Sequence, residues 1–296
     1  MKTIEGYTVQ FKQYLQQLGY SKSSVYMLPV CVADFLKYNS TVAPQELTQQ
    51  HIDAFYNYLH IRPHKHNTGA LSDSYIYHHV YALKLFFNYL EHTEQITCNP
   101  MSAMSFKRPK ICTREPLSTQ EINRLFETAQ TRKETAMLHL FYSCGLRRSE
   151  AVALNTQDIH FSQHLLYVRQ GKGHKRRVIP MTPGVSRALQ QYWEQETVHN
   201  QNKELEQDPK RSTDAFMVNT NGQRMRGDSY NRIIKHLVEK ADIQRPCTLH
   251  HLRHSIATHL LENGLSLENV RDFLGHSHLE ATQIYTKVGT YKLREL

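Results

Sequence analysis

The stretch Thr248-Leu249-His250-His251-Leu252-Arg253-His254 carries the clearest fold signal of this chain. An apolar-periodic run follows it, and then Leu274-Gly275-His276-Ser277 and Thr282-Gln283-Ile284-Tyr285. Thr or Ser before an apolar run is typical of a helix start, and glycine after it is typical of a helix end. We therefore predict short helices over 249–263, 266–274 and 279–287. His276 then falls in the turn after the second helix.

The polar residues of this stretch suit a phosphodiester. His250 and Arg253 are three residues apart, so they share one face of the first predicted helix. A guanidinium group matches the non-bridging oxygens of a phosphate, and an imidazole can donate to the same oxygens. A tyrosine hydroxyl such as that of Tyr285 can attack phosphorus and store the bond as phosphotyrosine. No carboxylate pair or nucleotide loop lies nearby in the sequence.

In this order, His250-x-x-Arg253, Leu274-Gly275-His276 and Tyr285 resemble the C-terminal signature of the tyrosine recombinases, the integrase family that includes the Xer proteins. The resemblance implies a site-specific recombinase that cleaves and rejoins DNA through a 3′-phosphotyrosyl intermediate. It implies neither metal nor ATP, and thus no cofactor. Tyr285 would be the nucleophile, His276 would donate to the phosphate, and His250 would assist one of the two.

Gly145-Leu146-Arg147-Arg148-Ser149-Glu150-Ala151 matches the family's first arginine motif. The match implies that Arg147, together with Arg253, binds the phosphate and that Glu150 supports the site. Arg148 should point elsewhere on a helix, either exposed or in contact with the DNA backbone.

Residues 159–180 alternate like β-strands at Ile159, 165–169 and 177–180, with Gly171-Lys172-Gly173 between the last two. Gly-Lys-Gly alone is typical of an ordinary basic turn. The family has its catalytic lysine in this hairpin, so the resemblance implies that Lys172 is the general acid. Lys175 and Arg176 are further candidates for DNA contact.

Residues 1–105 predict four helices, starting near Ile4, Ser21, Thr48 and Asp73. This unit resembles the SAM-like core-binding domain that precedes the catalytic domain in the family. Residues 106–115 would be a basic linker, in which Lys107, Arg108 and Lys110 could contact DNA. Residues 116–296 would be the catalytic domain, which starts with a capping box, Ser118-x-x-Glu121. The expected fold is mainly α-helical with a small antiparallel sheet.

The positive charge lies in the second part of the chain. Residues 1–105 hold seven of the 36 Lys and Arg residues and seven of the 27 Asp and Glu residues, so residues 106–296 carry the whole surplus of +9. Such a basic domain suits a polyanion, and we expect double-stranded DNA as the partner. The resemblance further implies a homotetramer on two synapsed DNA sites, with a dimer on each, and related recombinases or accessory proteins as partners.

Features that the sequence lacks indicate the cellular compartment and the type of recombinase. The five cysteines are scattered without a CxxC pair, and neither a signal peptide nor a run of about 18 apolar residues is found. We therefore expect a cytoplasmic protein without a membrane partner. No arm-binding domain precedes residue 1, which favours a simple Xer-like or transposon-type enzyme.

Three alternatives remain open. His250, His254 and His259 could bind zinc, but position 251 lacks the glutamate of an H-E-x-x-H helix. Residues 266–287 resemble a helix-turn-helix, so the chain could be a non-catalytic DNA-binding protein. Tyr291 could compete with Tyr285 as nucleophile. In the first part, His64, His66, His78 and His79 lack the spacing of a zinc site and are interpreted as surface or hinge residues.

Overall fold

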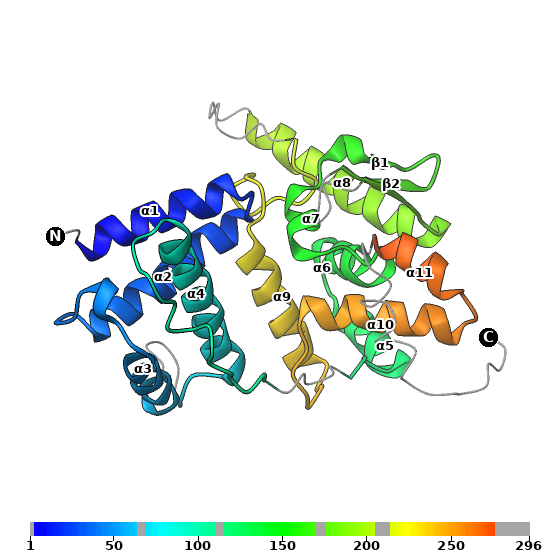
Figure 1. The fold of residues 1–296 in the computed structure, drawn as a ribbon. Coiled ribbons are helices and arrows are strands. Elements are labelled where there is room, and N and C mark those ends of the chain that lie inside the picture. The colour runs from blue at the N-terminus through cyan, green and yellow to red at the C-terminus, as the bar shows by residue number, and fades with distance from the viewer. Residues whose placement is uncertain (1–2, 64–68, 110–114, 170–175, 205–213, 276–296) are drawn as a thin grey trace. The chain divides into compact units, whose positions relative to one another are not determined.

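The computed structural model describes residues 3–63, 69–109, 115–169, 176–204 and 214–275, without the side chains of 197–204. The chain, drawn as a ribbon in Figure 1, divides into two compact units, Met1–Cys112 and Thr113–Leu296. Each unit has its own hydrophobic core. No helix in the described ranges is long and apolar enough to cross a membrane.

Four α-helices and a 3₁₀ turn form the described part of the first unit. They are α1 (Ile4–Gln17), α2 (Lys22–Tyr38), η1 (Pro44–Glu46), α3 (Gln49–Ile61) and α4 (Asp73–His92). The sequence predicted these helices because local signals start them: Ser21 and Ser72 accept from the backbone N–H groups of Ser24 and Tyr75.

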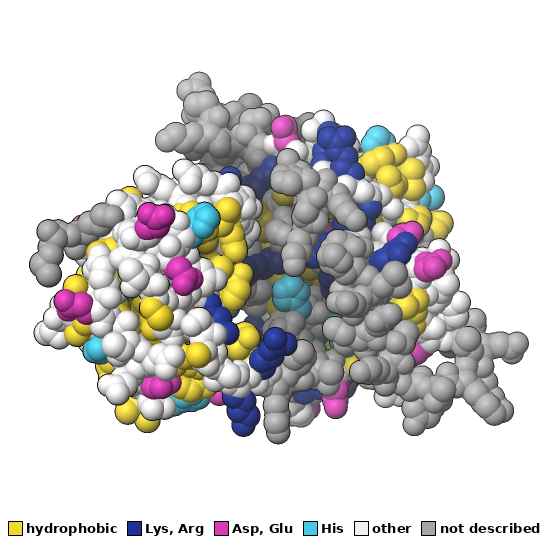
Figure 2. All heavy atoms as spheres, in the orientation of Figure 1, with side chains coloured by type: hydrophobic (Ala, Val, Ile, Leu, Met, Phe, Trp, Pro, Cys, Tyr) yellow, Lys and Arg dark blue, Asp and Glu magenta, His cyan; other side chains and the backbone are white. Residues whose placement is uncertain are grey.

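Aromatic rings fill the core of this unit. They come from the apolar stripe of each helix, at the positions Phe11, Phe35, Phe55, Phe86 and Phe87, and each is at most 1% exposed. Phe11 meets Phe86 edge-on with ring centroids 5.4 Å apart, and Phe35 meets Phe55 at 5.2 Å. On the face of this unit that Figure 2 shows, charged side chains stand singly rather than in a patch.

The interpretation of His79 as a surface or hinge residue is wrong. It is 1% exposed, and its Nε2 lies 3.3 Å from the Oδ2 of Asp34, which also accepts from Arg62 at 2.6 Å. Burial alone would lower the pKa of His79, but the hydrogen bond to Asp34 raises it to about 9. Asp34 comes from α2, so the sequence around His79 holds no sign of this partner. His78 is exposed, and His64 and His66 lie outside the described residues.

The second unit combines helices with one small sheet. Its described elements are α5 (Thr119–Thr128), α6 (Arg132–Leu138), a π-helical turn η2 (His139–Ser143), α7 (Arg148–Ala153), η3 (Thr156–Asp158), β1 (Ile159–His160), β2 (Leu165–Val168), β3 (Arg177–Pro180), α8 (Pro183–Glu204), α9 (Gly227–Lys240), α10 (Leu249–Glu262) and α11 (Leu267–Leu274). The capping box of Ser118 and Glu121 is confirmed. The polar stretch Asn200 to Thr213 predicts a loop, but this loop begins too early, because α8 continues to Glu204. The helix predicted over 279–287 lies outside the described residues.

The sheet is antiparallel with the order β1-β2-β3. Leu166 pairs with Ile159 on one side and Ile179 on the other, and all three are buried. Val168 pairs with Arg177 at the end of the β2–β3 ladder. The pleat therefore places Arg177 on the same face as Ile179, toward the core.

Helices α10 and α11 follow each other in the chain (Figure 1), and the buried side chains of Ala257, Val270 and Leu274 hold them together. Ser266 caps the start of α11 by accepting from the N–H of Asn269, as predicted. Gly275 ends it in the left-handed conformation with φ 64°. This packing brings the last turn of α11 next to the residues described below.

Candidate active site

Arg147 stands at the N-terminal end of α7. It is the cap residue, with an extended backbone, and Glu150 is the third residue of the helix. The Glu150 carboxylate accepts from the backbone N–H of Arg147 at 2.8 Å and from its guanidinium at 2.7 Å. The same three-residue spacing that makes a capping box thus joins the two side chains that the sequence singled out.

Three guanidinium groups surround the Glu150 carboxylate, whose side chain is 1% exposed. Arg177 makes a forked contact, with NH1 to Oε1 and NH2 to Oε2 at 2.9 Å each. The NH1 of Arg253 lies 3.8 Å from Oε2. Three cations against one carboxylate leave a surplus of positive charge, and such a surplus favours an anionic ligand.

The same arginines bind the C-terminal end of α11. Arg177 Nε donates to the carbonyl of Phe273 at 2.9 Å, Arg253 NH2 to Leu274 at 2.6 Å and Arg147 NH2 to Gly275 at 3.1 Å. Carbonyls in the last turn of a helix have no partner within the helix and carry partial negative charge. Each of three successive carbonyls therefore receives one guanidinium. Arg253 also donates to the carbonyl of Gly145.

Two glycines allow this close packing. Gly145 has φ 56°, and a Cβ there would lie 2.9 Å from Leu274 Cδ2. Gly275 has φ 64°, and a Cβ there would lie 2.9 Å from Arg177 Cδ. A side chain at either position would be strained and would push α11 from the arginines.

The structure brings together Arg147, Glu150 and Arg253, three of the residues that the sequence indicated. His250 lies on α10 and is exposed, whereas Arg253 on the same helix is 6% exposed. The described candidates for DNA contact, namely Lys107, Arg108, Arg148 and Arg176, are all exposed. Five candidates lie outside the described residues: Lys110, Lys172, Lys175, His276 and Tyr285.

The sequence reading missed Arg177, which was noted only as part of a strand. One signal could have indicated it: Arg177 is two residues from Ile179, so strand alternation turns it toward the core. A buried arginine needs a partner, and a carboxylate such as Glu150 was available. Its side chain is 8% exposed.

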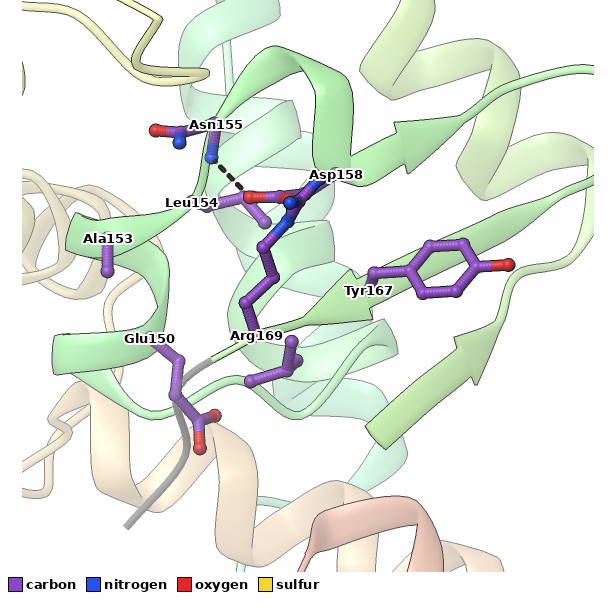
Figure 3. Close-up of a pocket in the computed structure, with 8 residues that line it drawn as sticks. Glu150, Ala153, Leu154, Asn155, Asp158, Tyr167 and Arg169 are labelled. Carbon is purple, nitrogen blue, oxygen red and sulfur yellow. Dashed lines mark hydrogen bonds and ion pairs between the residues drawn. The ribbon is translucent and has the colours of Figure 1, made fainter. Parts of the chain in front are cut away.

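The root of the β2–β3 hairpin holds a small cavity of about 180 Å³, lined by Glu150, Ala153, Leu154, Asn155, Asp158, Tyr167, Val168 and Arg169. Asp158 accepts from the backbone N–H of Asn155 at 2.9 Å and pairs with Arg169 (Figure 3). The ring of Tyr167 points away from both carboxylates (Figure 3). Two Arg–carboxylate pairs, Arg169–Asp158 and Arg177–Glu150, thus anchor the two strands of the hairpin.

Glu150 should make stability depend on pH. Burial alone would raise the pKa of Glu150, but the hydrogen bonds and charge of Arg177, together with those of Arg147, lower it from 4.5 to about 2. The folded state therefore binds this proton less readily than the unfolded state. The contribution of Glu150 to the free energy of unfolding is therefore fully present above pH 4.5 and is lost as the pH falls toward 2.

We therefore expect Glu150→Gln to be less stable than the unaltered protein at pH 7, by about 3 kcal/mol. The difference should shrink between pH 5 and pH 2, because the unaltered protein then loses the charge too. Urea unfolding followed by circular dichroism measures it. Arg245 also holds the pKa of Glu121 at about 2. Because Glu121 titrates in both proteins, its contribution cancels in the difference between their free energies of unfolding. A difference that stays constant with pH would contradict the prediction.

His259, one of the three candidate zinc ligands, is buried and its Nδ1 lies 2.9 Å from the hydroxyl of Tyr142. The sequence also allows His259 to be interpreted as a helix-packing residue, and this buried contact agrees with that interpretation. Within the ranges that the structure describes, no group of three or more His, Cys, Asp or Glu side chains could hold a metal ion.

Two family models match the chain. Residues 115–291 match the phage integrase family, and residues 8–97 match the phage integrase N-terminal SAM-like domain. Among curated relatives, tyrosine recombinase XerC of Chlamydia caviae is 40% identical over 178 residues, which are 58% of this chain and 54% of the relative. Tyrosine recombinase XerD of Listeria innocua is 31% identical over 223 residues, 74% of this chain and 73% of the relative.

Solved structures agree in fold. The XerA recombinase is 26% identical, with a TM-score of 0.52 over 96% of this chain and 94% of its own. The XerH recombinase in its post-cleavage complex with a palindromic difH substrate is 18% identical, with a TM-score of 0.69 over 95% and 81%. The Tn1549 transposon integrase in complex with transposon right end DNA is 17% identical, with a TM-score of 0.71 over 94% of both chains.

Proposed function

The chain belongs to the phage integrase family, the tyrosine recombinases, and we propose that Tyr285 is the nucleophile with which it cuts and rejoins DNA. Members of this family are enzymes of site-specific recombination, and the chain is one of them. The observation that best supports the proposed chemistry is the meeting of Arg147 and Arg253 at Glu150, although the two arginines lie far apart in the sequence.

In the proposed reaction, the Tyr285 oxygen attacks a DNA phosphate and releases a 5′-hydroxyl, leaving a 3′-phosphotyrosyl bond. Arg147 and Arg253 stabilise the charge that develops on the non-bridging oxygens. His276 donates a further hydrogen bond, Lys172 protonates the departing 5′-oxygen, and His250 assists the tyrosine or the phosphate. The phosphotyrosine keeps the bond energy, so another 5′-hydroxyl can reseal the strand without ATP.

DNA is the partner, and we propose how the chain holds it. Residues 1–105 would be the core-binding domain, 106–115 the linker and 116–296 the catalytic domain. Backbone phosphates would be contacted by exposed basic residues, namely Lys107, Arg108, Lys110, Arg148, Lys175 and Arg176. Contacts of this kind make binding weaken steeply with salt.

The assembly we propose is a homotetramer on two synapsed sites, with a dimer on each. The palindromic substrate of the related XerH supports it, because a DNA with two-fold symmetry suits two equivalent subunits. Related recombinases or accessory proteins could join it. We place the reaction in the cytoplasm, and the free thiols of Cys31, Cys98, Cys144 and Cys247 support a reducing compartment.

A covalent-adduct assay tests the proposal. The protein is mixed with supercoiled plasmid in excess EDTA and quenched with SDS, and sequencing of the trapped ends then identifies the cleaved site. We expect a protein–DNA adduct at 3′ ends. The contrary result is a protein that binds DNA but forms no covalent adduct, even with DNA taken from the replicon that carries its gene. In that case the non-catalytic DNA-binding alternative replaces this proposal.

Lys172→Ala should cleave ordinary DNA about 10²- to 10⁴-fold more slowly than the unaltered protein, because the 5′-alkoxide leaves poorly without a proton donor. A substrate with sulfur in place of the 5′-oxygen should restore cleavage, since a thiolate leaves without protonation. Single-turnover adduct formation on both substrates measures this. If the sulfur substrate remains equally slow, Lys172 is not the general acid.

A further inference from the structure

Arg177 connects two elements that carry the candidate active site. Its NH1 and NH2 donate to the two oxygens of Glu150, on α7, and its Nε donates to the carbonyl of Phe273, at the end of α11. We propose that Arg177 is a positioning residue for DNA cleavage: it holds Glu150 and α11 so that Arg147 and Arg253 meet the scissile phosphate in the right geometry. This inference rests on the proposed function.

The carboxylate of Glu150 has its acceptor positions filled. Oε1 accepts from Arg147 NH1 and Arg177 NH1, and Oε2 accepts from the backbone N–H of Arg147 and Arg177 NH2. A carboxylate offers about four such positions. Arg177 therefore occupies two of them.

With these positions occupied, Arg253 lies at ion-pair distance from the carboxylate rather than in a hydrogen bond to it. Its NH1 is 3.8 Å from Oε2, which is too long for a hydrogen bond. Without Arg177, two acceptor positions would open beside this guanidinium in a buried place. Arg253 would then be drawn onto Glu150, and a guanidinium bound there is less well placed for a phosphate.

Only arginine can make both connections. The three nitrogens of its planar group reach Glu150 and Phe273 at 2.9 Å each, whereas a lysine has one nitrogen on a flexible stem. Gly275 leaves room for the Arg177 side chain, because a Cβ there would lie 2.9 Å from Arg177 Cδ. The residue is 8% exposed, so its effect on DNA passes through its neighbours.

Arg177→Lys tests the proposal in the full-length protein. The probes are two duplexes of the cleaved site, one with an ordinary scissile phosphodiester and one with an uncharged methylphosphonate at that position. The neutral phosphorus depends less on correctly placed arginines. We expect Arg177→Lys to slow cleavage of the phosphodiester on the order of 10²-fold, the effect of a displacement of about 1 Å. The methylphosphonate should be slowed much less, with DNA affinity unchanged.

Arg224→Lys is the matched control. Arg224 is likewise an arginine that joins two positions of the chain, because it donates to the carbonyl of Val152 at 2.8 Å and to Asn155 Oδ1 at 2.6 Å. Among the residues that the structure describes, its hydrogen bonds go to neither Glu150 nor α11. Its replacement should lower stability but leave the ratio of the two cleavage rates at the value of the unaltered protein. Arg177→Lys could instead slow cleavage of both substrates by the same factor, equal to the loss of folded protein. Arg177 would then be only structural, and the proposal would be overturned.

Hydrogen exchange separates this proposal from the proposed function. Arg177→Lys should speed amide exchange in 267–275 but not in 249–262, whether or not the protein cleaves DNA. If the unaltered protein cleaves neither substrate, the proposed function fails by its own test. Unchanged exchange in 267–275 then overturns the anchoring role of Arg177 separately.

Discussion

Tyr285→Phe protein should bind DNA as the unaltered protein does and form no SDS-resistant adduct with it. The substitution removes one oxygen, which is the atom that attacks phosphorus in the proposed reaction. Phenylalanine keeps the aromatic ring and the substitution removes no positive charge, so the basic surplus that attracts the phosphates is retained. We therefore expect adduct formation to fall below detection while binding, measured by gel shift at fixed salt, stays within about twofold.

Tyr291→Phe is the matched control for this experiment. Tyr291 lies six residues after Tyr285 and was the competing candidate for the nucleophile. Its variant should form the adduct at the rate of the unaltered protein. An adduct that survives in Tyr285→Phe and vanishes in Tyr291→Phe would move the nucleophile to Tyr291. Mass spectrometry of the trapped peptide after nuclease digestion identifies the attached tyrosine independently.

Arg253→Ala should cleave DNA about 10²- to 10³-fold more slowly than the unaltered protein, the range found when one donor to a developing negative charge is removed. The same substitution should lower stability. The buried guanidinium donates to the carbonyls of Gly145 and Leu274, and each carbonyl left without a partner costs about 1–3 kcal/mol. Rates must therefore be compared at a temperature at which the variant is fully folded.

Arg271→Ala serves as the control for Arg253→Ala. It removes one positive charge from α11, and the described contact of Arg271 is with its neighbour Asp272, at 3.0 Å, rather than with Glu150. Its cleavage rate should stay close to that of the unaltered protein. A second variant, Arg253→Lys, keeps the charge but lacks the fork, so it should recover DNA cleavage only in part. Unchanged cleavage in Arg253→Ala would remove this residue from the site.

Local signals explain why most helices were predicted well. Ser118 and Glu121 cap α5, and Ser266 caps α11, through contacts across three residues. Such contacts depend on the chain within one turn, and a sequence pattern can therefore reveal them. The end of α8 was missed because Asn200 and the polar residues after it resemble a loop, whereas the helix continues to Glu204.

Buried polar clusters were predicted less well. His79 was interpreted as a surface or hinge residue, but it is buried against Asp34, 45 positions away in the sequence. Arg177 was seen only as part of a strand, although it holds Glu150 and α11. In both cases the partner lies on another element, and the free energy of the pair depends on burial that the sequence pattern does not contain.

The sequence by itself determined most of the described helices, the order of the strands along the chain and the family, because periodicity, caps and motif spacing are properties of neighbouring residues. It also indicated Arg147, Glu150 and Arg253 as parts of one site. Only the tertiary structure decided how these residues are held. Arg177 reaches Glu150 across 27 positions and Phe273 across 96, and these hydrogen bonds require the sheet and α11 to be packed close to α7. Contacts between distant positions produce no periodic pattern in the sequence, so they are seen only in the packed structure.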